Sequence, residues 1–69
     1  MYELIMLDKK GELLNEIKDI KNIHTARNFA THALNQIKVV YVQIWFSDRL
    51  EGVYVNYLGN KYKLIKTEE

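Results

Sequence analysis

The sequence contains no cysteine and no proline. Without cysteine it can form neither a disulfide framework nor a thiolate zinc site, and a small domain of this kind fits a reducing compartment. No segment approaches the roughly 18 apolar residues that a membrane span needs. The first residues lack a basic region and a small-residue cleavage site, so we expect no signal peptide. These absences predict a soluble cytoplasmic protein without a membrane partner.

A strong excess of either charge is also missing. The net charge is +1, whereas a dedicated DNA-binding domain has a clear basic excess. Carboxylates are absent from the middle of the chain, because no acidic residue lies between Asp19 and Asp48. Lys21, Arg27 and Lys38 lie within that stretch. The centre of the chain is therefore mildly cationic.

What is present suffices for one folded domain. Hydrophobic residues make up 48% of the chain, which argues against disorder. A chain of 69 residues is one domain and buries only roughly 60% of the surface of its unfolded form. A partner or a second copy would add stability to so thin a core. We expect a single α+β domain over residues 1–66 and a flexible tail over residues 67–69.

Periodicity and turn signals predict the order ββαβββ, an antiparallel sheet of about five strands with one helix packed on one face. Between the first two strands, Asp8 favours the start of a turn and Gly11 tolerates a positive φ. Apolar residues spaced three and four apart, up to Ile37, predict a helix from Asn22 to Lys38, with Asn22 as the first candidate N-cap and Thr25 as the later choice. The predicted segments are 2–7, 13–17, 22–38, 39–46, 53–58 and 61–66.

Loop lengths set the expected strand registers. A four-residue loop over 48–51 pairs Ile44 with Val55, and a loop over 59–60 pairs Leu58 with Lys61. The face under the helix then holds Val42, Ile44, Phe46, Val53, Val55, Tyr57, Tyr62 and Leu64. The opposite face holds Tyr41, Gln43, Trp45, Tyr54, Asn56, Lys63 and Ile65. One helix cannot cover both faces, so the second face is expected to be solvated, packed on another chain or covered by the first hairpin.

The second face predicts protein binding. Trp and Tyr combine an apolar body with a polar tip and are over-represented in interface hot spots. We predict a surface for a partner protein or a homodimer that contains Tyr41, Gln43, Trp45, Tyr54 and Asn56. The alternative is that these aromatic side chains only stabilise the sheet by cross-strand pairing.

Nucleic-acid binding is the second hypothesis. The outer face of the predicted helix is rich in hydrogen-bond donors and lacks carboxylates, which suits a phosphate backbone. The candidate residues are His24, Arg27, Asn28, Thr31, His32 and Lys38. The aromatic sheet face could also stack bases. The small net charge and the lack of an RNP-type motif or a glycine-rich phosphate loop argue against this hypothesis.

Enzymatic chemistry has little support. His24 and His32 share a helix face, but two turns separate them by roughly 12 Å, too far to ligate one ion together. An HExxH motif is absent, and no nucleophile motif surrounds Ser47. We therefore predict a non-catalytic protein with no metal and no cofactor.

The chain resembles small proteins encoded by phages, prophages and other mobile elements. The resemblance lies in the opening LIMLDKKGELLNEI, the helical phrase IKNIHTARNFATHAL and the following VVYVQIWFSDRLEGVYV. In such proteins a helix with an A-R pair is often followed by an apolar strand that ends in I-W. The resemblance implies a cytoplasmic accessory protein, some of whose counterparts bind and inhibit host or defence proteins. It assigns no functional residue.

Overall fold

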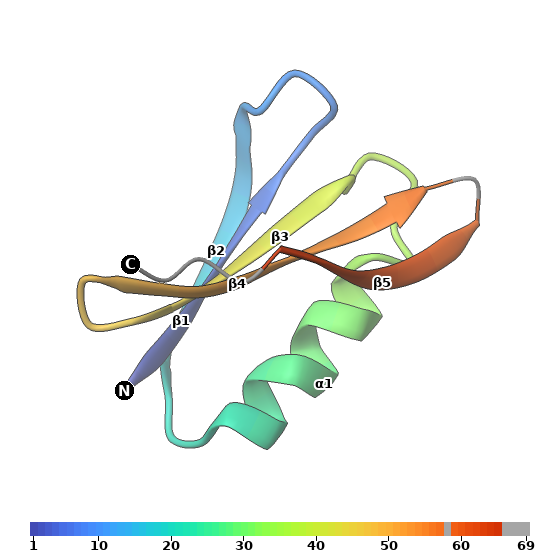
Figure 1. The fold of residues 1–69 in the computed structure, drawn as a ribbon. Helices are drawn as coiled ribbons and strands as arrows, with labels where there is room; N and C mark the ends of the chain where they lie inside the picture. Colours follow the sequence, from blue (N-terminus) through green and yellow to red (C-terminus); the bar gives the residue numbers. More distant parts are fainter. Residues whose placement is uncertain (58, 66–69) are drawn as a thin grey trace.

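One helix lies across one face of an antiparallel sheet in the computed structural model, which describes residues 1–57 and 59–65 (Figure 1). The predicted α+β class is confirmed for this part of the chain. The sheet order is β2-β1-β3-β4-β5, so the β2–α1–β3 connection passes over β1. The expected tail, residues 67–69, lies outside the described residues. The elements are β1 (Tyr2–Leu7), β2 (Leu13–Ile20), α1 (Ile23–Ala33), β3 (Tyr41–Phe46), β4 (Arg49–Tyr57) and β5 (Asn60–Ile65).

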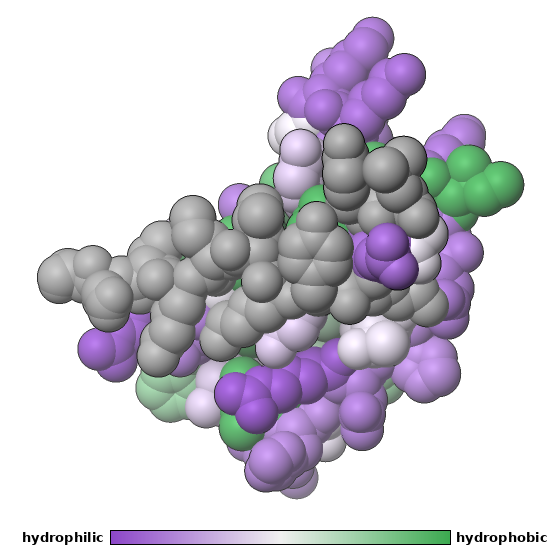
Figure 2. All heavy atoms as spheres, turned by 45° about the vertical axis from the view of Figure 1, so that its right-hand side comes forward, coloured by the Kyte–Doolittle hydropathy of each residue, from purple (hydrophilic) through white to green (hydrophobic). Residues whose placement is uncertain are grey.

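The N-terminal hairpin turns at Asp8, as expected. The N–H of Gly11 donates to the carbonyl oxygen of Asp8 at 2.9 Å, and Gly11 has a φ of 82°, where glycine avoids the clash of a side chain. Asp8 Oδ1 also accepts the backbone N–H groups of Lys10 and Glu12, each at 2.9 Å. The hairpin tip stands above the rest of the sheet, and hydrophilic side chains cover it (Figures 1 and 2). β1 lies within the sheet, so the hairpin does not fold over the second face as one of our alternatives had it.

The helix begins at Asn22, the earlier of the two candidate caps. Asn22 Oδ1 accepts the backbone N–H of Thr25 at 2.8 Å, which satisfies one donor that a helix start leaves unpaired. Ala26, Ala30 and Ala33 form the buried stripe of α1. Their small side chains let the helix backbone approach the sheet closely.

The helix ends earlier than predicted. Leu34 is its C-cap, so the expected end at Lys38 is wrong. Turn hydrogen bonds follow, among them Gln36 N–H to the carbonyl oxygen of Ala33 at 3.1 Å and Val39 N–H to that of Gln36 at 3.1 Å. Ile37 consequently leaves the apolar stripe and is 97% exposed.

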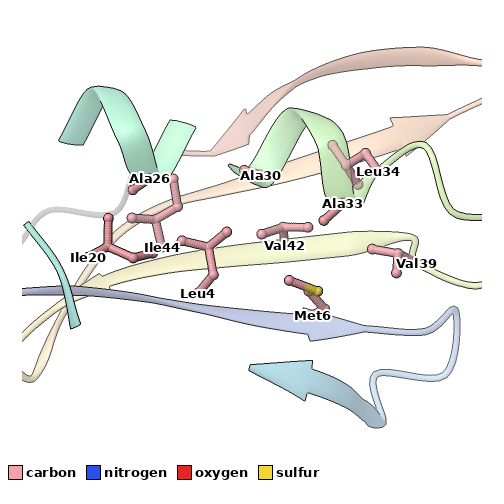
Figure 3. Packing of buried hydrophobic residues seen from close by; sticks show 10 residues of the cluster. All are labelled: Leu4, Met6, Ile20, Ala26, Ala30, Ala33, Leu34, Val39, Val42 and Ile44. Atoms are coloured by element: carbon pink, nitrogen blue, oxygen red, sulfur yellow. The ribbon is translucent and has the colours of Figure 1, made fainter. Parts of the chain in front are cut away.

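The core lies between α1 and the centre of the sheet. Figure 3 shows Leu4 and Met6 of β1 beside Val42 and Ile44 of β3, with the helix alanines facing them. Ile20, at the end of β2, closes the cluster near the start of the helix. All the polar side-chain atoms buried within the described residues have a hydrogen-bond partner. The remaining members of the cluster are Ala26, Ala30, Ala33, Leu34 and Val39.

The pairing of β3 with β4 differs from our prediction by three residues, because Ile44 pairs with Gly52 and not with Val55. The loop is Ser47–Asp48, because Phe46 already pairs with Arg49, and Ser47 adopts a φ of 58°. Further along, Trp45 pairs with Leu50 and Ile44 pairs with Gly52, so Glu51 forms a β-bulge. Val42 and Ile44 point toward the helix, as predicted. Val53 and Val55 do not: they pair with Gln43 and Tyr41 and point to the opposite face.

The last turn is also displaced. Tyr57 pairs with Asn60, so the loop does not comprise residues 59–60 as predicted. Gly59 has a φ of 82°. Several side chains for which we predicted a sheet face lie outside the described part of the structure. They are those of Tyr57, Tyr62, Lys63, Leu64 and Ile65.

Candidate functional site

The sheet face opposite the helix forms a contiguous grid of side chains. β3 supplies the centre with Tyr41, Gln43 and Trp45, which alternate with core residues. Leu7, Ile5 and Glu3 of β1 pair with these three residues on one side, and Val55, Val53 and Leu50 of β4 pair with them on the other. Residues paired directly across antiparallel strands share a face and lie close together. We call these nine residues the open sheet face.

Three of the five residues predicted to bind a partner lie together here. Tyr41, Gln43 and Trp45 are all partly exposed. Trp45 Nε1 donates to Gln43 Oε1 at 3.0 Å, on the same strand. The indole donor is therefore satisfied within the protein, and the ring presents an apolar surface.

The other two predicted binding residues lie on the wrong face. Tyr54 pairs with Val42 and packs against the core under the helix. Asn56 Nδ2 donates to the carbonyl oxygen of Leu34 at 2.8 Å, so its side chain holds the end of α1. The bulge at Glu51 causes this difference, because one extra residue reverses the facing of every residue that follows.

Sequence analysis missed the apolar partners of the aromatic residues. Ile5 and Leu7 lie beside Gln43 and Tyr41, and Val53 flanks Gln43 from the other side. Apolar residues at both parities of β1 were the available signal, because a strand with one solvated face normally alternates with polar residues. Val55 is only 6% exposed and belongs to the same face.

The outer face of α1 has the composition expected from the sequence. His24, Arg27, Asn28, Thr31 and His32 are all exposed. The hydroxyl of Thr31 donates to the carbonyl oxygen of Arg27 at 3.0 Å and so is already engaged. Lys38 follows the end of the helix and does not belong to this face, which corrects the sixth predicted residue.

A shallow hollow of about 490 Å³ lies between the hairpin turn and the segment that follows the helix. The backbone N–H of Glu12 lowers the pKa of Asp8 below its ordinary value, partial burial opposes this effect, and the N–H and charge of Lys10 reinforce it. The lining combines cationic, acidic and apolar residues: Asp8, Lys9, Lys10, Glu12, Leu14, Ile37 and Lys38.

Within residues 1–57 and 59–65, no three histidine or carboxylate side chains lie close enough to hold a metal ion. The helix in this same part of the chain is too short and too polar to cross a bilayer.

Comparison of the chain with protein-family models, with curated proteins and with solved structures finds no match.

Proposed function

We propose that this protein is a non-catalytic interaction module that binds another protein through its open sheet face. In this proposal the domain has five strands and one helix in the order ββαβββ. As part of the same proposal, the protein acts in the cytoplasm as an accessory protein of a phage or another mobile element. This last part rests on the sequence resemblance alone.

The hydrogen bond between Trp45 and Gln43 is the observation that carries the proposal. Burying an indole N–H without a partner costs free energy, so a Trp at the centre of a dry interface needs a hydrogen-bond acceptor. Here the donor is already paired at 3.0 Å. A partner can therefore cover the ring of Trp45 without supplying an acceptor, and it gains the large apolar area of the indole.

The charges on this face define the chemistry of the partner. Glu3 pairs with Trp45, and Glu16 pairs with Ile5, so both carboxylates border the apolar patch. A complementary surface would be apolar at its centre and carry Lys or Arg at its rim. We therefore propose a partner protein with a basic rim as the ligand of the open sheet face.

The test is a double variant of the two aromatic residues, Tyr41→Ala with Trp45→Ala. Phe29→Ala is the matched control, because Phe29 is an exposed aromatic residue on the helix. Candidate partners retained by the immobilised wild type should be purified and titrated against each variant by calorimetry, with circular dichroism as the check on folding. We expect the control to bind like the wild type and the folded double variant to lose at least tenfold in affinity. A folded double variant with wild-type affinity would rule out this face.

Nucleic-acid binding remains the second candidate function. The observation that favours it is the joint exposure of His24, Arg27, Asn28, Thr31 and His32 on one helix face without a carboxylate. Lys38 no longer adds to that face, which weakens the candidate. Binding of this type should decline steeply with salt and should weaken in Arg27→Ala. Failure of single-stranded DNA and RNA to bind at low salt would remove it.

A further inference from the structure

β2 forms one edge of the sheet. It pairs with β1 on one side, and it is the first strand in the order β2-β1-β3-β4-β5 (Figure 1). Between Leu13 and Asp19 all residues except Ile17 are exposed. An edge strand of this kind presents unpaired backbone donors and acceptors, to which another strand can bind.

The direction of these free groups follows from one hydrogen bond. The backbone N–H of Glu16 donates to the side chain of Asn15, Oδ1, at 2.8 Å in an exposed position. This N–H therefore points away from β1. In an antiparallel pair the backbone groups of alternate residues point to opposite sides, so Ile17 faces its partner Leu4. The N–H of Lys18 shares a peptide unit with the carbonyl of Ile17 and therefore points outward. A register shift follows between the pairs Leu4–Ile17 and Tyr2–Ile20.

The exposed edge is complementary to itself. If a second copy pairs antiparallel with a two-fold axis at Ile17, Glu16 of each copy lies directly opposite Lys18 of the other. The symmetry produces this opposite-charge pair twice. Opposite charges directly across a ladder stabilise it, and like charges destabilise it. The same register places Asn15 opposite Asp19, which has a φ of 64° and lies in the register shift of β2 between Ile17 and Ile20.

We propose that β2 pairs edge to edge with β2 of a second copy and joins the two sheets into one. The outward N–H of Lys18 from the second copy donates to the carbonyl oxygen of Glu16. Charged side chains on an edge discourage pairing with other strands, and here they allow a match with an identical strand. The two-fold axis is normal to the sheet, so both helices lie on one side and both open sheet faces on the other.

Charge reversal tests this register. Light scattering after size exclusion, over a series of protein concentrations, should show a concentration-dependent dimer for the wild type. Glu16→Lys and Lys18→Glu should each be monomeric, because each places like charges opposite one another twice. An equimolar mixture of these two variants should recover the dimer mass, and so should the double variant Glu16→Lys with Lys18→Glu. Recovery in the mixture also shows that both variants are folded.

Two controls separate this proposal from binding at the open sheet face. Glu12→Lys changes an exposed charge next to the turn, outside the ladder, and should leave the dimer intact. Tyr41→Ala with Trp45→Ala should also leave it intact while weakening the binding of the partner protein at least tenfold. A wild type that is monomeric at every soluble concentration would overturn the proposal. So would a dimer that survives both single reversals, or one that only the aromatic double variant dissociates.

Discussion

Asn56 of β4 donates from Nδ2 to the carbonyl oxygen of Leu34 at 2.8 Å, so the strand is hydrogen-bonded directly to the C-cap of α1. We expect Asn56→Ala to reduce the free energy of unfolding by about 1–2 kcal/mol, because a partly buried carbonyl loses its donor. In a domain of this size each kcal/mol corresponds to a fall in Tm of roughly 4–8 °C. Thermal unfolding followed by circular dichroism measures the effect. Asn28→Ala, at an exposed helix position, is the control, and equal melting temperatures for both variants would contradict the assignment.

The N-cap offers a second prediction. Asn22→Ala removes the acceptor for the N–H of Thr25 and should cost about 1 kcal/mol of stability. Asn22→Ser retains a capping oxygen and should restore most of the loss. Urea unfolding of the wild type and the two variants measures these differences in the free energy of unfolding. If the Ser variant is no more stable than the Ala variant, the side chain of Asn22 does not contribute through capping.

The close approach of the helix to the sheet depends on Ala30, which is fully buried. Ala30→Leu inserts a larger side chain between α1 and the sheet and should destabilise the fold by about 1–3 kcal/mol. Asn28→Leu introduces the same side chain on the exposed side of α1 and should change the stability only slightly. Denaturant midpoints compare the two variants. A neutral Ala30→Leu would mean that α1 packs more loosely than we describe.

The contribution of Asp8 to the stability of the hairpin turn should depend on pH. Hydrogen bonding to Asp8 lowers its pKa from the ordinary 3.8, so the ionised group stabilises the folded state at pH values above that figure. This contribution is lost as the pH falls through the folded-state pKa. The stability gap between wild type and Asp8→Ala should therefore be constant near neutrality and narrow in strong acid. Urea midpoints across that range provide the measurement, with Asp8→Asn as a control that keeps the acceptor and cannot titrate. A gap independent of pH would contradict the role of the carboxylate.

Local signals predicted the local structure well. Asp8 and Gly11 marked the first turn, and Asn22 marked the start of the helix, because each acts through hydrogen bonds or backbone angles within a few residues. The strict alternation of β3 placed Ile44 under the helix and Trp45 on the opposite face. These features depend on the chain within a few residues of each signal, so the sequence contains enough information to find them.

Features that depend on distant contacts were not predictable in this way. Ser47 has a φ of 58° although it is not a glycine. The loop that contains it is shorter than predicted, and the bulge at Glu51 follows it in β4. The early end of α1 coincides with the bond that Asn56 makes to Leu34, 22 residues apart in the chain. Residues 49–51 were predicted to lie in a loop, yet they belong to β4, and Gly52 is a buried residue of the same strand opposite Ile44. These outcomes placed Tyr54 and Asn56 on the helix side, contrary to the predicted site.

The bulge at Glu51 determines which face of the sheet each later residue of β4 occupies. Slid by one residue into a regular ladder, β4 would send Val53 and Val55 under the helix and turn Tyr54 and Asn56 outward. Both registers place hydrophobic side chains in the interior, so the burial of apolar surface alone does not distinguish between them. The side-chain amide of Asn56 distinguishes the two registers. It donates to the carbonyl oxygen of Leu34 in the observed register, and it would point into solvent in the regular one.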